Sequence, residues 1–100
     1  ITVASSLHYS SISVWEIARL QKEGKVVIPV DAEEFLADLT ELYGLSAIPP
    51  NDDIMLRAAN LPDFHKDPAD RIIIATALIR GMPIVTGDGN FSQYGVKTIC

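Results

Sequence analysis

The sequence contains one cysteine and no long apolar run, and each shortage excludes a class of protein. Cys100 has no second cysteine in the chain, so an internal disulfide is excluded and a reducing cytoplasm is the expected location. The longest apolar run, Ile72 to Ile79, includes Thr76 and is far shorter than the roughly 18 residues that a membrane span requires. No basic segment with a following apolar stretch opens the chain, so neither a membrane span nor a secretory signal is expected.

Basic residues are also scarce, with 8 Lys and Arg against 13 Asp and Glu and a net charge of −5. This balance argues against a general electrostatic clamp on nucleic acid, because such a clamp neutralises phosphates with Lys and Arg. It does not exclude a nucleic-acid substrate that is bridged by metal ions. Divalent cations held by clustered carboxylates invert the local charge and can themselves meet a phosphate.

Apolar strand patterns alternate with helix patterns along the chain, which predicts an α/β fold with a mainly parallel sheet and helices on its faces. The pattern predicts a strand over residues 7–13, followed by a helix that Ser13 caps, with Glu16 as the second member of a capping box. Asp31 is predicted to cap a helix over residues 32–43. The strongest helix start is Asp67 followed by Pro68, and Gly81 is predicted to end that helix.

Three carboxylates occupy positions at which parallel α/β sheets commonly have their ligand-binding and catalytic residues. Glu16 and Asp70 lie early in predicted helices, and Asp88 follows the predicted strand at residues 83–85. Ligands of open α/β sheets bind outside the carboxyl ends of strands. Hard cations such as Mg²⁺ and Mn²⁺ require carboxylate oxygens that converge from separate elements. We therefore predict that Glu16, Asp70 and Asp88 form a metal site suited to phosphodiester hydrolysis.

Each acid also has an ordinary structural explanation. Glu16 can belong to a capping box, Asp70 can be a first-turn acid that the helix dipole favours, and Asp88 can be a turn residue beside Gly87. Asp67 is interpreted first as the helix cap rather than as a ligand. Only the combination of the three acids favours the metal interpretation.

The remaining candidate residues are expected either to support the metal ligands through hydrogen bonds or to have no role in the site. Trp15 is interpreted as core packing, and the two histidines have no partner at a metal-ligand spacing. A serine nucleophile is not supported, because the sequence has no Gly-x-Ser-x-Gly elbow. The side chains expected to hydrogen-bond the ligand carboxylates or a metal-bound water are Asp67, Thr86, Asn90 and Ser13.

Three motifs in this order resemble those of the PIN-domain family, and more narrowly those of VapC-type toxins of toxin–antitoxin pairs. The resemblance covers nearly the whole chain from Leu7 onward. The motifs are Ser13-Val14-Trp15-Glu16-Ile17-Ala18, His65-Lys66-Asp67-Pro68-Ala69-Asp70-Arg71 leading into Ile74-Ala75-Thr76-Ala77, and Thr86-Gly87-Asp88 with Phe91 and Tyr94-Gly95-Val96.

The resemblance implies a three-layer α/β/α sandwich over residues 1–100 as a single PIN-like domain. It implies an acidic pocket that binds Mg²⁺ or Mn²⁺ and an endoribonuclease that uses a metal-activated water. It also implies a cognate antitoxin that blocks the site. Carried over residue by residue, Glu16, Asp70 and Asp88 match the family's catalytic and metal-binding acids.

The chain departs from the family pattern at its amino end, where the family has a strand carrying an Asp-Thr or Asp-Ser that supplies the first carboxylate. No such segment is present, so we expect a domain that lacks the first strand and is truncated there. Unpaired strand edges invite pairing with another chain. The expectation is a homodimer or higher self-association and weak or absent activity.

Two other classes of function remain open from the sequence. One is a catalytically silent PIN-like interaction module for antitoxin binding or dimerisation, which the absent first carboxylate favours. The other is a Mg²⁺-dependent phospho-acceptor domain, but its paired acids after the first strand and its later lysine are not at the expected places. The RNA target, transfer, ribosomal or messenger, is not indicated by any base-stacking motif.

Overall fold

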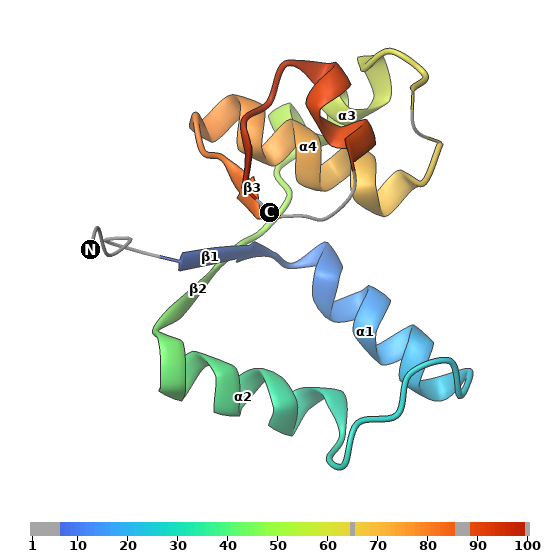
Figure 1. The fold of residues 1–100 in the computed structure, drawn as a ribbon, viewed down its shortest axis with the longest axis vertical. Helices are drawn as coiled ribbons and strands as arrows, with labels where there is room; N and C mark the ends of the chain where they lie inside the picture. Colours follow the sequence, from blue (N-terminus) through green and yellow to red (C-terminus); the bar gives the residue numbers. More distant parts are fainter. Residues whose placement is uncertain (1–6, 65, 86–88, 100) are drawn as a thin grey trace. The chain divides into compact units, whose positions relative to one another are not determined.

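The computed structural model describes residues 7–64, 66–85 and 89–99. The chain divides into two compact units, Ile1–Pro49 and Pro50–Cys100, and both combine helices with a pair of parallel strands. Figure 1 shows the elements of each unit along the colour ramp from blue to red. The predicted α/β class with parallel strands is confirmed.

In the first unit, two helices follow each other along the chain between two strands, and these two strands pair with each other. Strands β1 and β2 run parallel, with Leu7 opposite Leu45 and Ser10 opposite Ile48. Ser10 and Ile48 are the buried ends of the two strands, at 6% exposure each. The elements in chain order are β1 (Leu7–Ser10), α1 (Ile12–Lys22), α2 (Ala32–Tyr43) and β2 (Leu45–Ile48).

The beginning of α1 differs from the prediction. The strand ends at Ser10 rather than Ser13, and Ser11 is the N-cap residue without a side-chain cap hydrogen bond. The Ser11 amide donates to the Ile48 carbonyl at 3.2 Å, and the Ile12 amide donates to Ser10 Oγ at 3.3 Å. Since these bonds turn the chain into the helix earlier, the predicted capping box of Ser13 and Glu16 is wrong.

The bounds predicted for α2 are confirmed at both ends. The Asp31 carboxylate accepts the Glu34 amide at 2.8 Å, which satisfies one of the free donors of the first turn. The helix ends at Gly44, whose φ of 63° is left-handed and whose amide donates to the Thr40 carbonyl. A residue with a Cβ is strained in that conformation, which explains the glycine.

The second unit is built around α4. Its other helix, α3, begins where Asn51 accepts the Ile54 amide at 2.9 Å, and Figure 1 shows α3 and α4 packed together. Strands β3 and β4 pair in parallel, with Ile84 opposite Thr98. The elements in chain order are α3 (Asp52–Asn60), α4 (Pro68–Arg80), β3 (Ile84–Val85), the 3₁₀ helix η1 (Gly89–Tyr94) and β4 (Thr98–Ile99).

Helix α4 contributes more buried residues to the core of this unit than any other described element. Ile74 and Ala75 are fully buried at 0% exposure, and the Thr76 hydroxyl donates to the Ile72 carbonyl at 2.7 Å, so its burial leaves no unpaired polar atom. Alanines at 69, 75 and 77 allow neighbouring elements to approach closely. With 13 residues, α4 is the longest helix in the described part of the chain, where no helix has the length and apolarity needed to cross a bilayer.

Replacement of Ile74 by alanine is expected to lower the free energy of unfolding by about 2–5 kcal/mol, because the truncated side chain leaves a cavity in the core. Ile79→Ala on the same helix is the matched control, since Ile79 is 41% exposed. The measurement is equilibrium denaturation in urea. Equal losses for the two variants would contradict the assignment of the core.

Candidate metal centre

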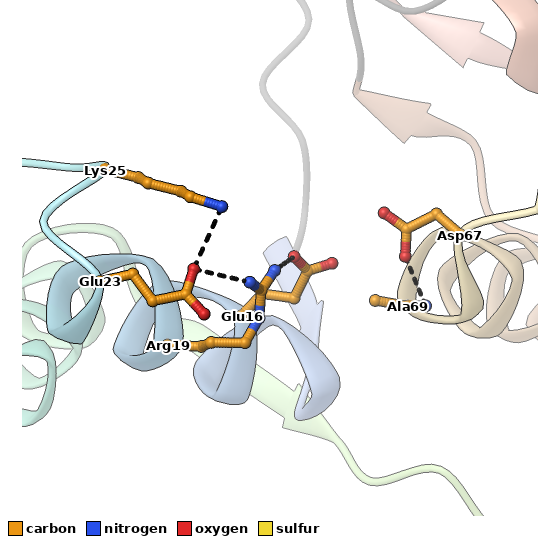
Figure 2. A network of polar contacts seen from close by, with 6 residues as sticks. All are labelled: Glu16, Arg19, Glu23, Lys25, Asp67 and Ala69. Atoms are coloured by element: carbon orange, nitrogen blue, oxygen red, sulfur yellow. Dashed lines mark hydrogen bonds and ion pairs between the residues drawn. The ribbon is translucent and has the colours of Figure 1, made fainter.

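The first turn of α4 begins where the sequence predicts. Asp67 is the N-cap residue, and its Oδ1 accepts the Ala69 amide at 3.0 Å (Figure 2). Pro68 occupies the first helical position, where its missing N–H is no loss. Asp70 follows in the first turn, where the positive end of the helix dipole favours a carboxylate.

Asp67 and Asp70 lie close together on this turn, each with a carboxylate oxygen within 4.8 Å of the other's. Asp67 is exposed and Asp70 is half-buried. One oxygen of Asp67 accepts the capping bond, so the cap interpretation is confirmed. The pair offers the hard oxygen ligands that Mg²⁺ and Mn²⁺ prefer.

Glu16 lies on α1 in the first unit. It is the fifth residue of that helix, beyond the first turn, which contains no acidic residue. The interpretation of Glu16 as a member of a capping box is therefore wrong. The Glu16 side chain is 21% exposed, and its Oε2 is 3.5 Å from Arg19 Nη2.

Arg19 connects several groups along α1, as Figure 2 shows. Its Nη1 donates to Glu23 Oε2 at 3.1 Å, and its guanidinium carbon lies 5.2 Å from the centre of the Trp15 ring. Trp15 is 58% exposed, so its interpretation as core packing is wrong. The arginine stacks on the ring instead, a cation–π contact that lets a tryptophan stay at the surface.

Glu23 forms a second ion pair with Lys25, whose Nζ lies 3.3 Å from Glu23 Oε2. The hydrogen bond from Lys25 is the main cause that lowers the pKa of Glu23, and the charges of Lys25 and Arg19 act in the same direction. A lowered pKa in the folded state adds stability above the unfolded pKa, and that stability is lost as the pH falls through the folded pKa.

Not every predicted site residue is described. Asp88 and Thr86 lie outside the described residues, as does His65. Asn90 falls in η1, with its side chain outside the described part, and Ser13 lies in the first turn of α1. Within the second unit the structure brings Asp67 and Asp70 together, while Glu16 is described in the first unit by itself.

Sequence reasoning missed two arginines beside the predicted acids, Arg19 and Arg71. Arg19 is three residues after Glu16 on the same helix, a spacing that places two side chains together. Arg71 directly follows Asp70, and its side chain is only 12% exposed. Charge spacing on α1 was a usable signal for Arg19, whereas the contacts of Arg71 depend on the turn before α4.

Parallel strands, capped helices and paired carboxylates at a helix start define an α/β protein with an acidic centre, and comparison with known proteins agrees. The PIN domain family matches residues 1–97, so the chain belongs to the PIN-domain family. The fold is similar to that in the solved structure of FitAB bound to an IR36 DNA fragment. The TM-score is 0.67 at 19% identity, over 98% of this chain and 75% of that one.

Within the family the chain is similar to VapC proteins, as its motifs predict. It is 34% identical over 92 residues to Ribonuclease VapC22 of Mycobacterium tuberculosis (strain ATCC 25618 / H37Rv). The alignment covers 91% of this chain and 69% of the relative. The predicted membership of the PIN-domain family and the similarity to VapC are confirmed.

Asp67→Ala is expected to lower the free energy of unfolding by about 1 kcal/mol, because the Ala69 amide loses its acceptor. Asp67→Asn keeps a carbonyl oxygen at the cap and should lose clearly less. Thermal unfolding of both variants measures the difference. An equal loss in the two variants would show that the charge of Asp67, rather than its capping bond, stabilises the turn.

Lys25→Met is expected to raise the pKa of Glu23 toward its ordinary value of 4.5, because the principal hydrogen-bond donor is removed. The pKa is read from the Glu23 carboxyl carbon in an NMR titration. Lys22→Met removes a charge from the last turn of the same helix, and Lys22 forms no ion pair with Glu23 among the described residues. An equal rise in both variants would mean that overall charge, not the contact, lowers this pKa.

Proposed function

We propose that this chain is a metal-dependent endoribonuclease of the VapC type that hydrolyses RNA phosphodiester bonds. The observation that carries the proposal is the pair of carboxylates at the start of α4, with oxygens within 4.8 Å, in a chain 34% identical to a named ribonuclease. The similarity to a ribonuclease supports RNA hydrolysis as the reaction, and the pair of acids offers oxygen ligands for the cation that this reaction would use.

The donor set fits Mg²⁺ or Mn²⁺. Both residues at the helix start are carboxylates, and hard cations prefer oxygen ligands to nitrogen or sulfur. One helix turn cannot surround an ion, so further ligands must come from other elements. We assign that part to Glu16 and Asp88, which the family motifs match, and keep Asp70 as the central ligand.

The protein's own groups have distinct parts in this proposal. Asp70, Glu16 and Asp88 hold the cation as catalytic residues. Asp67 caps the start of α4 with one carboxylate oxygen and helps to orient the site. Thr86, Asn90 and Ser13 hydrogen-bond the ligand carboxylates and hold them in place. A divalent cation held by these residues would supply neutralisation of phosphate charge and activation of water as the nucleophile of hydrolysis.

The acidic composition agrees with this assignment of parts. A chain with a net charge of −5 has few basic side chains to neutralise an RNA backbone. Cations held by the acids invert the charge where the scissile phosphate must lie, so RNA contacts the ions first. Binding should therefore depend strongly on divalent cations.

We further propose that a cognate antitoxin covers this site, that copies of the chain associate with each other, and that the protein works in the cytoplasm. The similarity to VapC22 supports the antitoxin, because the resemblance is to toxins of toxin–antitoxin pairs. The single cysteine supports a reducing compartment.

Asp70→Asn is expected to reduce RNA cleavage by about 100-fold or more, because the amide replaces the charged ligand that the cation requires. The assay measures cleavage of a mixed RNA substrate with Mn²⁺, with Mg²⁺ and with chelator. Asp53→Asn is the matched control, since Asp53 is an exposed acid in the first turn of α3 in the same unit.

The assay is repeated with a strand carrying an aspartate fused ahead of Ile1, which supplies the carboxylate that the family resemblance expects there. Cleavage that needs a divalent cation and Asp70 but not Asp53 supports the proposal. If neither form cuts RNA, the proposal is wrong and the silent interaction module becomes the better explanation.

A further inference from the structure

Arg71 occupies an unusual position between the two helices of the second unit. Its side chain belongs to α4 but reaches back to the end of α3 and the turn that follows. The guanidinium donates to Ala58 O (3.1 Å, from Nε), Pro62 O (3.0 Å, from Nη1), Asp63 Oδ1 (3.4 Å, from Nη1), Ala59 O (3.4 Å, from Nη2) and Leu61 O (2.7 Å, from Nη2).

These contacts replace an ordinary helix ending. The last four carbonyls of a helix have no partner within it, and α2 and α4 end at glycines in the left-handed conformation. The residue after α3 is Leu61, with an extended backbone at φ −65° and ψ 149°. Arg71 satisfies carbonyls there instead, and its positive charge lies at the negative end of the α3 dipole.

The same contacts fix the first turn of α4. Arg71 directly follows Asp70, and its own amide donates to the Asp67 carbonyl at 3.0 Å. A guanidinium held at several points therefore restrains the backbone that carries both carboxylates. We infer that Arg71 is a positioning residue, which orients Asp67 and Asp70 for the divalent cation. This inference rests on the proposed function.

A direct contact with RNA is a poorer assignment for Arg71. A guanidinium has five N–H donors, and the five bonds to residues 58–63 use one from Nε, two from Nη1 and two from Nη2. The side chain is only 12% exposed. With its donors engaged and its surface covered, Arg71 acts through Asp70 rather than on a phosphate.

The test measures Mn²⁺ binding directly, by the loss of the electron paramagnetic resonance signal of free Mn²⁺. Arg71→Lys keeps the charge but not the planar fork, so we expect the Kd for Mn²⁺ to rise about 10-fold. Amide exchange at residues 68–71 should become faster, and cleavage at saturating Mn²⁺ should stay near that of the unchanged chain. Arg71→Gln, which keeps two donors without charge, is measured alongside in case the lysine variant does not fold.

Two controls separate positioning from general stability. Asp63→Asn removes only the ion pair to a side chain that is 87% exposed, and it should leave the Kd unchanged. Ile74→Val destabilises the core without touching Arg71, and it should lower the melting temperature without changing the Kd.

The outcomes are distinguishable. Mn²⁺ binding that Asp70→Asn abolishes and the Arg71 variants weaken supports the inference. Binding that Asp70→Asn abolishes but that the folded Arg71 variants retain in full overturns it and leaves the proposed function intact. If the unchanged chain binds no Mn²⁺ and cuts no RNA, the proposed function and this inference both fail.

Discussion

The capping bond from the Ala69 amide to Asp67 fixes where α4 begins, and the second unit is built around that helix. Each residue of an α-helix is rotated by about 100° from the one before it, so the order of residues along α4 decides which side chains share a face. With the start at Pro68, the polar first turn carries Asp70 and the apolar body is buried. The cap thus fixes the start of the helix, and the residue order that follows it places Asp70 on the first turn and the apolar side chains in the core.

The pair of acids on that turn has an electrostatic cost that the fold only partly offsets. Two like charges about 4 Å apart repel by about 1 kcal/mol in water, and more where water is excluded. The positive N-terminal end of a helix stabilises a nearby carboxylate by typically about 0.3–1 kcal/mol. In the proposed function, a divalent cation held by both carboxylates would replace this repulsion by attraction of each carboxylate to the ion.

The sequence was sufficient for the features that depend on neighbouring residues. Caps at Asp31, Asn51 and Asp67 and stops at Gly44 and Gly81 were predictable because each acts within one helical turn. The start of α1 was not, since it depends on the Ile48 carbonyl of a strand far along the chain. Trp15 was misassigned for a related reason, because its partner is the Arg19 side chain rather than the core. Asp70 could be predicted as a candidate from its motif, whereas its nearness to the Asp67 carboxylate required the structure.

The ending of α3 shows why an arginine suits this place better than a glycine. A glycine cap satisfies the carbonyls of its own helix and leaves the next helix independent of it. Arg71 satisfies carbonyls of α3 from within α4, so neither helix end can move without breaking hydrogen bonds of the other. Side chains at a site must be held to a fraction of an ångström for catalysis, and rigid elements do this better than loops. Arg71 therefore joins the first turn that carries Asp70 to the end of α3 at several fixed points, in addition to the loop that connects the two helices.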